Sequence, residues 1–131
     1  MGYVRYLVDI FENGGKYLMS WKDCDYKEIK ELKKNSILEL PWDFPEKGEY
    51  IRKYEMNNVP IAFIRSSPDP EDKKSIFIDE FEVIKRYRKQ GLGKKLICEF
   101  LEGADSDVKL LAKNKGVQIF WEKCGFVDNG I

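Results

Sequence analysis

The chain has 131 residues, a length that fits one compact domain, and we expect residues 1–131 to form one. Hydrophobic residues make up 43% of it and aromatic residues 14%, enough for a core, which argues against disorder of the whole chain. Lys plus Arg and Asp plus Glu both number 23, so the formal net charge is zero. This balance gives no support for nucleic acid as a partner, which a basic excess would favour.

The sequence contains no histidine. This excludes a Ser-His-Asp or Cys-His nucleophilic site, a histidine-ligated zinc site and a histidine general base. The cysteines Cys24, Cys98 and Cys124 are far apart and form no C-x-x-C pair, a pattern typical of reduced cytosolic thiols. Residues 1–20 lack a secretory signal, and no stretch approaches the ~18 apolar residues that span a bilayer. We expect a cytoplasmic protein without a metal or a membrane partner.

The N-terminal part of the chain predicts two strands and a helix. Residues 3–11 and 16–21 are rich in β-formers and flank a Glu-Asn-Gly-Gly turn sequence. Asp23 or Asp25 then offers an N-cap for a helix that runs to about Lys34.

The middle of the chain predicts a hairpin between two irregular segments. Residues 36–50 are apolar but broken by proline, so a short helix or an ordered loop is expected, either covering a pocket or packing as an ordinary loop. Residues 49–56 and 59–65 predict two strands joined by a turn at residues 57–58. The polar residues 66–74 predict a loop.

The C-terminal half alternates strands and helices. Residues 75–84 are apolar on both faces, which is typical of a strand in the middle of a sheet. Residues 91–102 carry one apolar stripe and predict a helix, residues 107–112 a short buried strand, residues 114–123 a second helix and residues 126–131 a last strand. The fold class is therefore α/β or α+β, with a central mixed sheet flanked by helices.

Two glycines, Gly91 and Gly93, stand between the predicted strand and helix. Because they lack Cβ atoms, an anion can come close to the main chain there. The amides of residues 90–94 begin a helix and point outward with its positive dipole end, so a pyrophosphate fits. Arg86, Arg88, Lys94 or Lys95 would add positive charge there. The sequence lacks both the phosphate-binding G-x-x-x-x-G-K-[ST] and the full G-x-G-x-x-G of dinucleotide folds. A glycine pair alone is equally compatible with a structural turn.

The residues on either side of the two glycines help to decide between an anion-binding turn and a structural turn. The segment VIKRYRKQGLGKKL, residues 83–96, resembles the acetyl-CoA signature of the GCN5-related N-acetyltransferases (the GNAT superfamily), V-x-x-x-Y-R-x-x-G-x-G. A second segment, Asn114 with FWEKCGF at residues 120–126, is similar to the superfamily's N-x(5)-F-Y-x-x-x-G-F. The two motifs stand in the expected order and together cover roughly residues 75–126.

The resemblance implies a single GNAT-like domain with a twisted, mixed, mostly antiparallel sheet. It implies that two parallel strands, near residues 77–84 and 108–112, splay apart and hold acetyl-CoA as co-substrate. The pantetheine arm would pair with main-chain groups near Val83, and a bulge there would direct the thioester carbonyl toward a backbone amide. Asn114 would contact that arm or begin the second helix. The coenzyme-binding residues implied are Phe81, Val83, Arg88, Lys89, Gln90, Gly91, Leu92, Gly93, Lys94, Asn114, Phe120 and Trp121.

Acetyl transfer to an amine needs a base, and carboxylates are the remaining candidates at neutral pH. Asp79 and Glu80 lie in an otherwise apolar strand, where acidic residues must face solvent, a pocket or a partner. Strand alternation places them on opposite faces unless a bulge intervenes. Asp79 is the preferred base, because some relatives, including aminoglycoside acetyltransferases, place an acid nine residues before the residue matching Arg88. Glu80 and Glu82 are weaker candidates, and surface charge is the plainer interpretation of all three.

Trp121 stands where many members of the superfamily have the tyrosine that protonates the coenzyme thiolate. We expect it to pack against the coenzyme. Either the thiolate leaves without a side-chain acid, or Tyr87, Cys124 or water replaces the tyrosine, or turnover is lost. The expected function is an N-acetyltransferase for an unidentified primary amine, acting by direct attack in a ternary complex. The alternative is a catalytically weak acyl-CoA-binding module that serves as a sensor or partner domain. A monomer and a homodimer are both compatible with the sequence.

Overall fold

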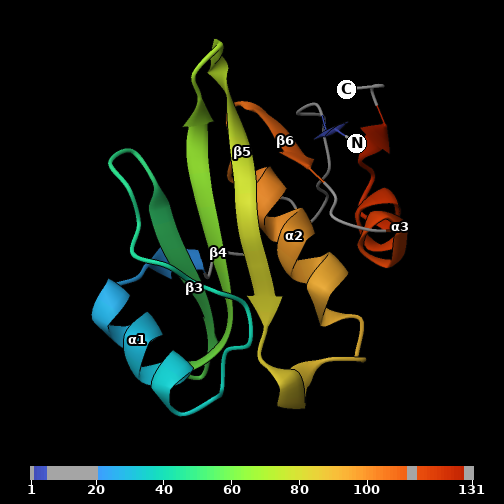
Figure 1. Cartoon of the computed structure of the whole chain (residues 1–131). Helices are drawn as coiled ribbons and strands as arrows, with labels where there is room; N and C mark the ends of the chain where they lie inside the picture. The colour runs from blue at the N-terminus through green and yellow to red at the C-terminus, as the bar shows by residue number, and fades with distance from the viewer. Residues whose placement is uncertain (1, 6–20, 112–114, 129–131) are drawn as a thin grey trace.

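The computed structural model describes residues 2–5, 21–111 and 115–128 of the chain. The described residues form a sheet, three α-helices and a short 3-10 helix (Figure 1). In chain order these are β1 (Gly2–Arg5), β2 (Trp21–Asp23), α1 (Tyr26–Lys34), β3 (Tyr50–Met56), β4 (Val59–Asp69), β5 (Asp72–Val83), η1 (Lys85–Tyr87), α2 (Leu92–Glu102), β6 (Asp107–Leu111), α3 (Lys115–Lys123) and β7 (Val127–Asp128).

The sheet has the strand order β2-β3-β4-β5-β6-β1-β7. The pair β5 and β6 is parallel, and the other pairs among the described strands are antiparallel. This confirms the expected mixed, mostly antiparallel sheet, with β5 in its middle. The N-terminal strand β1 lies between β6 and β7 and is antiparallel to both.

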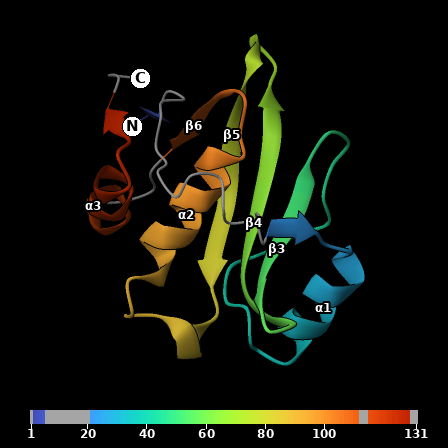
Figure 2. The same cartoon turned by 180° about the vertical axis from the view of Figure 1, so that it is seen from behind.

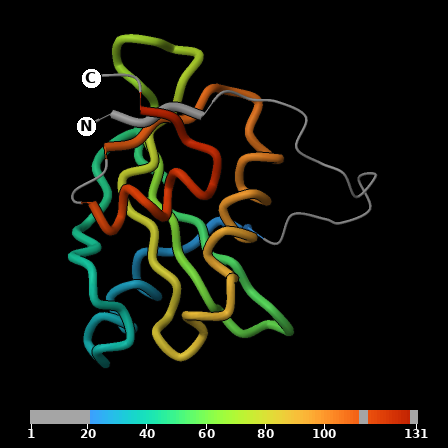
Figure 3. Tube along the Cα trace, turned by 90° about the vertical axis from the view of Figure 1, so that its right-hand side faces the viewer, coloured from blue at the N-terminus to red at the C-terminus, as the bar shows by residue number. Residues whose placement is uncertain are grey.

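The helices cover the two faces of the sheet. Helices α2 and α3 pack on one face, and α1 with the segment 35–49 covers the other (Figures 1 and 2). Each face has its own buried cluster: Ile64, Leu96 and Trp121 belong to the first, and Ile29, Trp42 and Phe63 to the second. Seen from the side, α2 runs beside the strands (Figure 3). The protein therefore has three layers: α2 and α3, the sheet, and α1 with the segment 35–49.

Local sequence signals explain the start of α1 and the β3–β4 turn. The Asp25 carboxylate accepts a hydrogen bond of 3.0 Å from the Lys27 amide, so Asp25, not Asp23, is the N-cap. Asn57 and Asn58 have φ of 53° and 65°, the left-handed pair that a two-residue type I′ hairpin requires and that asparagine tolerates. The predicted helix and hairpin are thereby confirmed.

Three sequence-based predictions have different outcomes in the structure. The predicted loop at 66–74 is wrong: β4 and β5 continue through it and leave residues 70–71 as the turn. Polar composition does not prevent a strand there, because the hairpin ladder satisfies the main-chain groups. Of its side chains, Ser66 and Asp69 are buried, whereas Lys73 and Lys74 are exposed. Segment 35–49 forms no regular element, so the ordered loop is confirmed over the short helix. Of the two strands predicted before residue 22, residues 6–20 lie outside the described part.

A β-bulge interrupts the pairing of β4 with β5. Arg65 pairs with Glu80, and the next residue, Ser66, pairs with Ile78, which leaves Asp79 as the extra residue. Such a bulge changes the side-chain alternation of the longer strand. The expected opposite orientation of Asp79 and Glu80 therefore does not hold.

The parallel pair is short and anchored at one end. Only Ser75, Ile76 and Phe77 of β5 pair with β6. At this end, the Lys109 ammonium lies 2.8 Å from an Asp69 carboxylate oxygen and 3.7 Å from Asp72. These contacts fix β6 to the β4–β5 hairpin, and beyond them β5 and β6 separate.

The Lys109 anchor gives stability a defined pH dependence. The hydrogen bond with Asp69 raises the pKa of Lys109 above 10.5. The same bond lowers the pKa of Asp69 below 3.8, and the Ser75 hydroxyl does so for Asp72. The stabilisation is therefore fully present between these limits. It is lost as the pH falls through the folded pKa values of the two aspartates, or rises through that of Lys109.

We expect Lys109→Met to lower Tm at pH 7 and to have a much smaller effect at a pH below the lowered pKa values of Asp69 and Asp72, because the aspartates are protonated there. Thermal unfolding followed by circular dichroism measures this. Lys73→Met, at an exposed position of the same hairpin, is the control and should change Tm little at either pH. An equal loss of Tm for Lys109→Met at both pH values would contradict the proposed ion pair.

Candidate functional site

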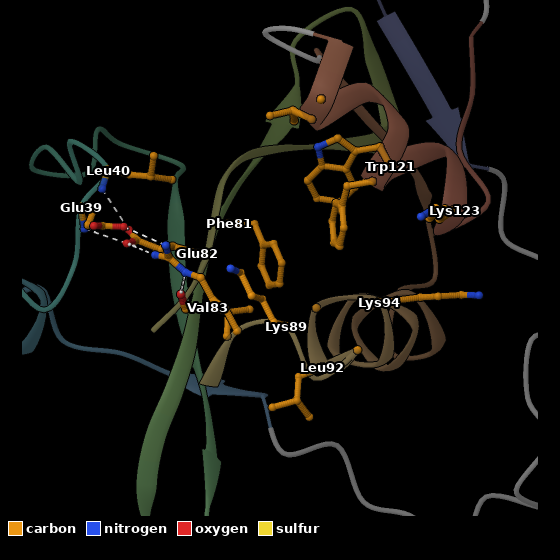
Figure 4. Close-up of a pocket in the computed structure, with 16 residues that line it drawn as sticks. Glu39, Leu40, Phe81, Glu82, Val83, Lys89, Leu92, Lys94, Trp121 and Lys123 are labelled. Carbon is orange, nitrogen blue, oxygen red and sulfur yellow. Dashed lines mark hydrogen bonds and ion pairs between the residues drawn. The ribbon is translucent and has the colours of Figure 1, made fainter. Parts of the chain in front are cut away.

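A pocket of about 720 Å³ opens where β5 separates from β6 (Figure 4). Its walls come from the 39–40 segment, the end of β5, the turn before α2, and α3. The lining residues are Glu39, Leu40, Phe81, Glu82, Val83, Arg88, Lys89, Gly91, Leu92, Gly93, Lys94, Gly116, Val117, Phe120, Trp121 and Lys123. Most of the predicted coenzyme-binding residues are thus brought together.

One wall of the pocket is an open strand edge. From Ile78 to Val83 no described strand pairs with β5 on the β6 side. Main-chain donors and acceptors on such an edge can pair with an extended ligand. The Val83 carbonyl already accepts a hydrogen bond of 2.7 Å from Arg88 Nε. The predicted splay of the parallel strands is confirmed.

Glycine is present at the two positions of the turn for different structural reasons. Gly91 is the N-cap of α2 with a φ of 74°, and a Cβ built on it meets no atom within 4 Å. Its left-handed conformation favours glycine, and it faces open space as expected. A Cβ on Gly93 would lie 3.0 Å from the Phe120 ring, so in this structure the packing of Phe120 also requires that glycine.

The charges around the turn divide into paired and free groups. Arg88 is paired: its guanidinium contacts Glu39 Oε1 at 2.8 Å and Glu82 Oε2 at 3.1 Å. Lys89 and Lys94 also line the pocket, but the Lys94 ammonium points away from it (Figure 4). Lys89 is therefore the better placed cation of the predicted set.

Aromatic rings form the wall opposite the glycine turn. Phe81 from β5 stacks on Phe120 from α3, with ring centroids 6.0 Å apart and planes 14° apart. Trp121 packs against both and against Phe126, and only 7% of it is exposed. Phe81 and Trp121 both project toward the pocket (Figure 4). Trp121 is thus a packing residue at the pocket.

Four residues that the sequence suggested for the site are not among the described residues that line the pocket. Gln90 is exposed in the glycine turn and does not line the pocket, and Asn114 lies outside the described residues. The candidate acids Tyr87 and Cys124 do not line the pocket either, and Tyr87 lines a separate groove near the end of α1.

The carboxylates Asp79 and Glu80 both contact groups on the face covered by α1. Glu80 lies 3.2 Å from Arg65 Nε and accepts a hydrogen bond of 3.3 Å from the Trp42 amide. Asp79 accepts a hydrogen bond of 2.7 Å from the Ser67 hydroxyl, and desolvation raises its pKa above 3.8. Neither residue lines the pocket, but Asp79 stands about 7 Å along the strand from Phe81.

Glu82 makes more contacts than the sequence predicts. Its side chain is buried, with 5% of the residue exposed, and it accepts hydrogen bonds from the amides of Glu39 and Leu40, from the Trp42 indole and from Arg88. The signal was present as an acidic residue in an apolar strand, but three of its four donors come from residues 39–42, forty or more residues earlier. Only the tertiary structure identifies them.

The described residues were compared with the requirements of a metal site, a membrane span and a reactive thiol. Within residues 2–5, 21–111 and 115–128, no group of three or more potential ligands is placed to hold a metal ion. None of the helices in that part of the chain is long and apolar enough to cross a membrane. No disulfide joins Cys24, Cys98 and Cys124. Burial raises the pKa of the Cys24 thiol to about 12, which makes it unreactive.

Solved structures share the fold. A GCN5-related N-acetyltransferase from Kribbella flavida has a TM-score of 0.57 at 14% identity, covering 96% of this chain and 52% of its own. An aminoglycoside N-acetyltransferase in complex with CoA has a TM-score of 0.55 at 15% identity, covering 85% and 93%. A proposed streptothricin acetyltransferase from Bacillus anthracis, in complex with acetyl coenzyme A, has a TM-score of 0.50 at 28% identity, covering 73% and 54%.

The chain thus spans about half the length of the Kribbella and Bacillus proteins. No curated protein matches it. The model of the acetyltransferase (GNAT) family matches residues 12–126, which include the strand, the glycine turn and the aromatic helix that form the pocket. The chain belongs to the GNAT family of acetyltransferases.

Proposed function

We propose that this protein is an N-acetyltransferase that moves an acetyl group from acetyl-CoA to a primary amine by direct attack in a ternary complex. The observation that carries the proposal is the open β5 edge beside the glycine turn, in one pocket of about 720 Å³. The family match supports acetyl-CoA as the co-substrate. So do two structural neighbours, solved with CoA and with acetyl coenzyme A.

The residues of the pocket suit a long ligand with an anionic and an amide-containing part. The first amides of α2 have no acceptor within the helix and lie at its positive end, which favours a pyrophosphate. Lys89 adds positive charge at that end, whereas the charge of Arg88 is already matched by Glu39 and Glu82. The edge of β5 offers main-chain groups to a pantetheine arm, and Phe81 and Trp121 exclude water beside it.

Asp79 is our proposed general base. Its pKa is raised by desolvation, and within the described part of the chain it accepts a hydrogen bond from the Ser67 hydroxyl and forms no ion pair, so it can accept a proton from an ammonium group. Glu80 is held by Arg65 and by the Trp42 amide, and we assign it a positioning role instead. For the leaving group, a thiol pKa of about 8.5 makes direct departure of the thiolate reasonable without an acid at Trp121.

The alternative function is that of an acyl-CoA-binding module without catalysis. An assay of thiol release distinguishes this alternative from an enzyme. Acetyl-CoA is incubated with the protein and a panel of polyamines, aminoglycosides, amino acids and peptides, and free CoA is titrated with a thiol reagent. Release that depends on an amine supports the enzyme. Tight binding of acetyl-CoA without release on any amine supports the module.

The pyrophosphate site is tested by two variants of equal shape. Asparagine and aspartate both tolerate the left-handed conformation at position 91, and a side chain there meets no protein atom. We expect Gly91→Asp to weaken CoA binding at least about tenfold relative to Gly91→Asn, because its charge repels the pyrophosphate. Isothermal titration calorimetry measures the affinity, and Tm should be similar for both. Equal affinities would place the pyrophosphate elsewhere.

The role of Lys89 is tested by the salt dependence of binding. Lys89→Gln should weaken CoA binding several-fold at low ionic strength and reduce the dependence of the affinity on salt, since one cation facing the ligand is removed. The control is Lys95→Gln, on the exposed side of α2 and outside the pocket lining. If the two variants bind CoA equally well, Lys89 does not contact the anionic part.

The base is tested by the pH dependence of kcat/KM with the best amine found. A base must be ionised, so activity should fall as the pH drops through the raised pKa of Asp79. Asp79→Asn should lower the rate roughly 10²-fold or more and remove this acid limb. Ser67→Ala removes a hydrogen bond that lowers this pKa, so it should move the limb to higher pH. A limb that is unchanged in both variants belongs to another group.

A further inference from the structure

The carboxylate of Glu82 connects the coenzyme turn with the segment that covers the other face of the sheet. Its Oε2 accepts from the Glu39 amide at 2.7 Å and from Arg88 at 3.1 Å. Its Oε1 accepts from the Leu40 amide at 3.0 Å and from the Trp42 indole at 2.8 Å. Both oxygens are thus occupied twice, and the group is buried, so it is suited to hold neighbouring groups and not to take a proton from an amine.

Arg88 extends this connection to the coenzyme turn. Its Nε donates to the Val83 carbonyl at 2.7 Å, and its two terminal nitrogens contact Glu39 and Glu82. One planar guanidinium therefore spans three segments: the end of β5, the 39–42 segment and the start of the turn that leads to Gly91. Lysine has a single ammonium and cannot reproduce this fork.

The 39–42 segment is held in a conformation that it would not adopt alone. Trp42 has a φ of 45°, which is rare for a bulky side chain. Its carbonyl accepts from the Tyr26 hydroxyl at 2.8 Å, and its amide and indole donate to Glu80 and Glu82. Such strain persists only where several surrounding contacts fix it, and two of those contacts are the β5 carboxylates.

The same groups line the pocket. Glu39 and Leu40 form one wall, Glu82 and Arg88 join it, and the glycine turn lies across from them. A ligand that fills this pocket contacts the segment and the guanidinium that holds it. Its binding and the order of the segment are then linked, and such a link acts in both directions.

We infer that Glu82 and Arg88 are positioning residues that couple occupancy of the coenzyme pocket to the order of segment 39–42. This rests on the proposed function, because the coupling needs coenzyme in the pocket. The 39–42 segment lies on the face of the sheet where Asp79 and Glu80 have their partners. The coupling would therefore link the order of the acceptor side of the sheet to binding of the acyl donor.

Hydrogen exchange of the Glu39 and Leu40 amides measures this coupling directly, since both donate to Glu82. In the unmodified protein, saturating CoA should slow their exchange about tenfold or more. In Arg88→Lys, which keeps a positive charge beside Glu82, saturating CoA should slow it less than about twofold. Arg86→Lys is the matched control and should behave like the unmodified protein, because Arg86 stacks on Tyr87 outside the pocket.

The outcomes separate the two proposals. If calorimetry detects no CoA binding to the unmodified protein, the proposed function fails and the coupling fails with it. If CoA binds but the Glu39 and Leu40 amides exchange as fast as before, the coupling is overturned and coenzyme binding stands. Full protection in Arg88→Lys would remove Arg88 from the coupling. The first measurement uses the unmodified protein, so it does not depend on how well a variant folds.

Discussion

The separation of β5 from β6 is the constraint on which the site depends. The two strands pair over three residues and are tied at that end by Lys109, Asp69 and Asp72. The rest of β5 has a free edge, and an unpaired edge in the middle of a sheet is unfavourable unless something else covers it. Here the aromatic residues of α3 and the turn before α2 approach the edge without closing it, and they leave a pocket of about 720 Å³.

The sequence predicted the elements that rest on local signals. The apolar stripe of α2, the Asp25 cap and the Asn57–Asn58 turn each act within a few residues, so periodicity and turn chemistry identified them. The hairpin tip at 66–74 was missed, because a cross-strand ladder outweighs polar composition. The bulge at Asp79 could not be predicted, because register depends on which residues of β4 stand opposite.

In the candidate site, too, features that rest on local sequence were predicted and features that rest on distant residues were not. The glycine turn has a physical reason of its own as an anion site, and the resemblance to the family's two motifs assigned it and the aromatic helix to the coenzyme. Glu82 was undervalued, because an acid in an apolar strand shows only that a partner must exist, and its donors lie far away in the chain. The pairing of Arg88 with Glu39 and Glu82 also changes its expected role from phosphate charge to structural connection.

We propose that acyl-CoA binds along the free edge of β5, and a crystal structure with acetyl-CoA tests this most directly. It should show the pyrophosphate at the amides that begin α2, the pantetheine arm along residues 78–83, and the acyl group beyond the aromatic rings of Phe81 and Trp121. Acetyl-CoA bound at any other surface, with the β5 edge unoccupied, would contradict the account.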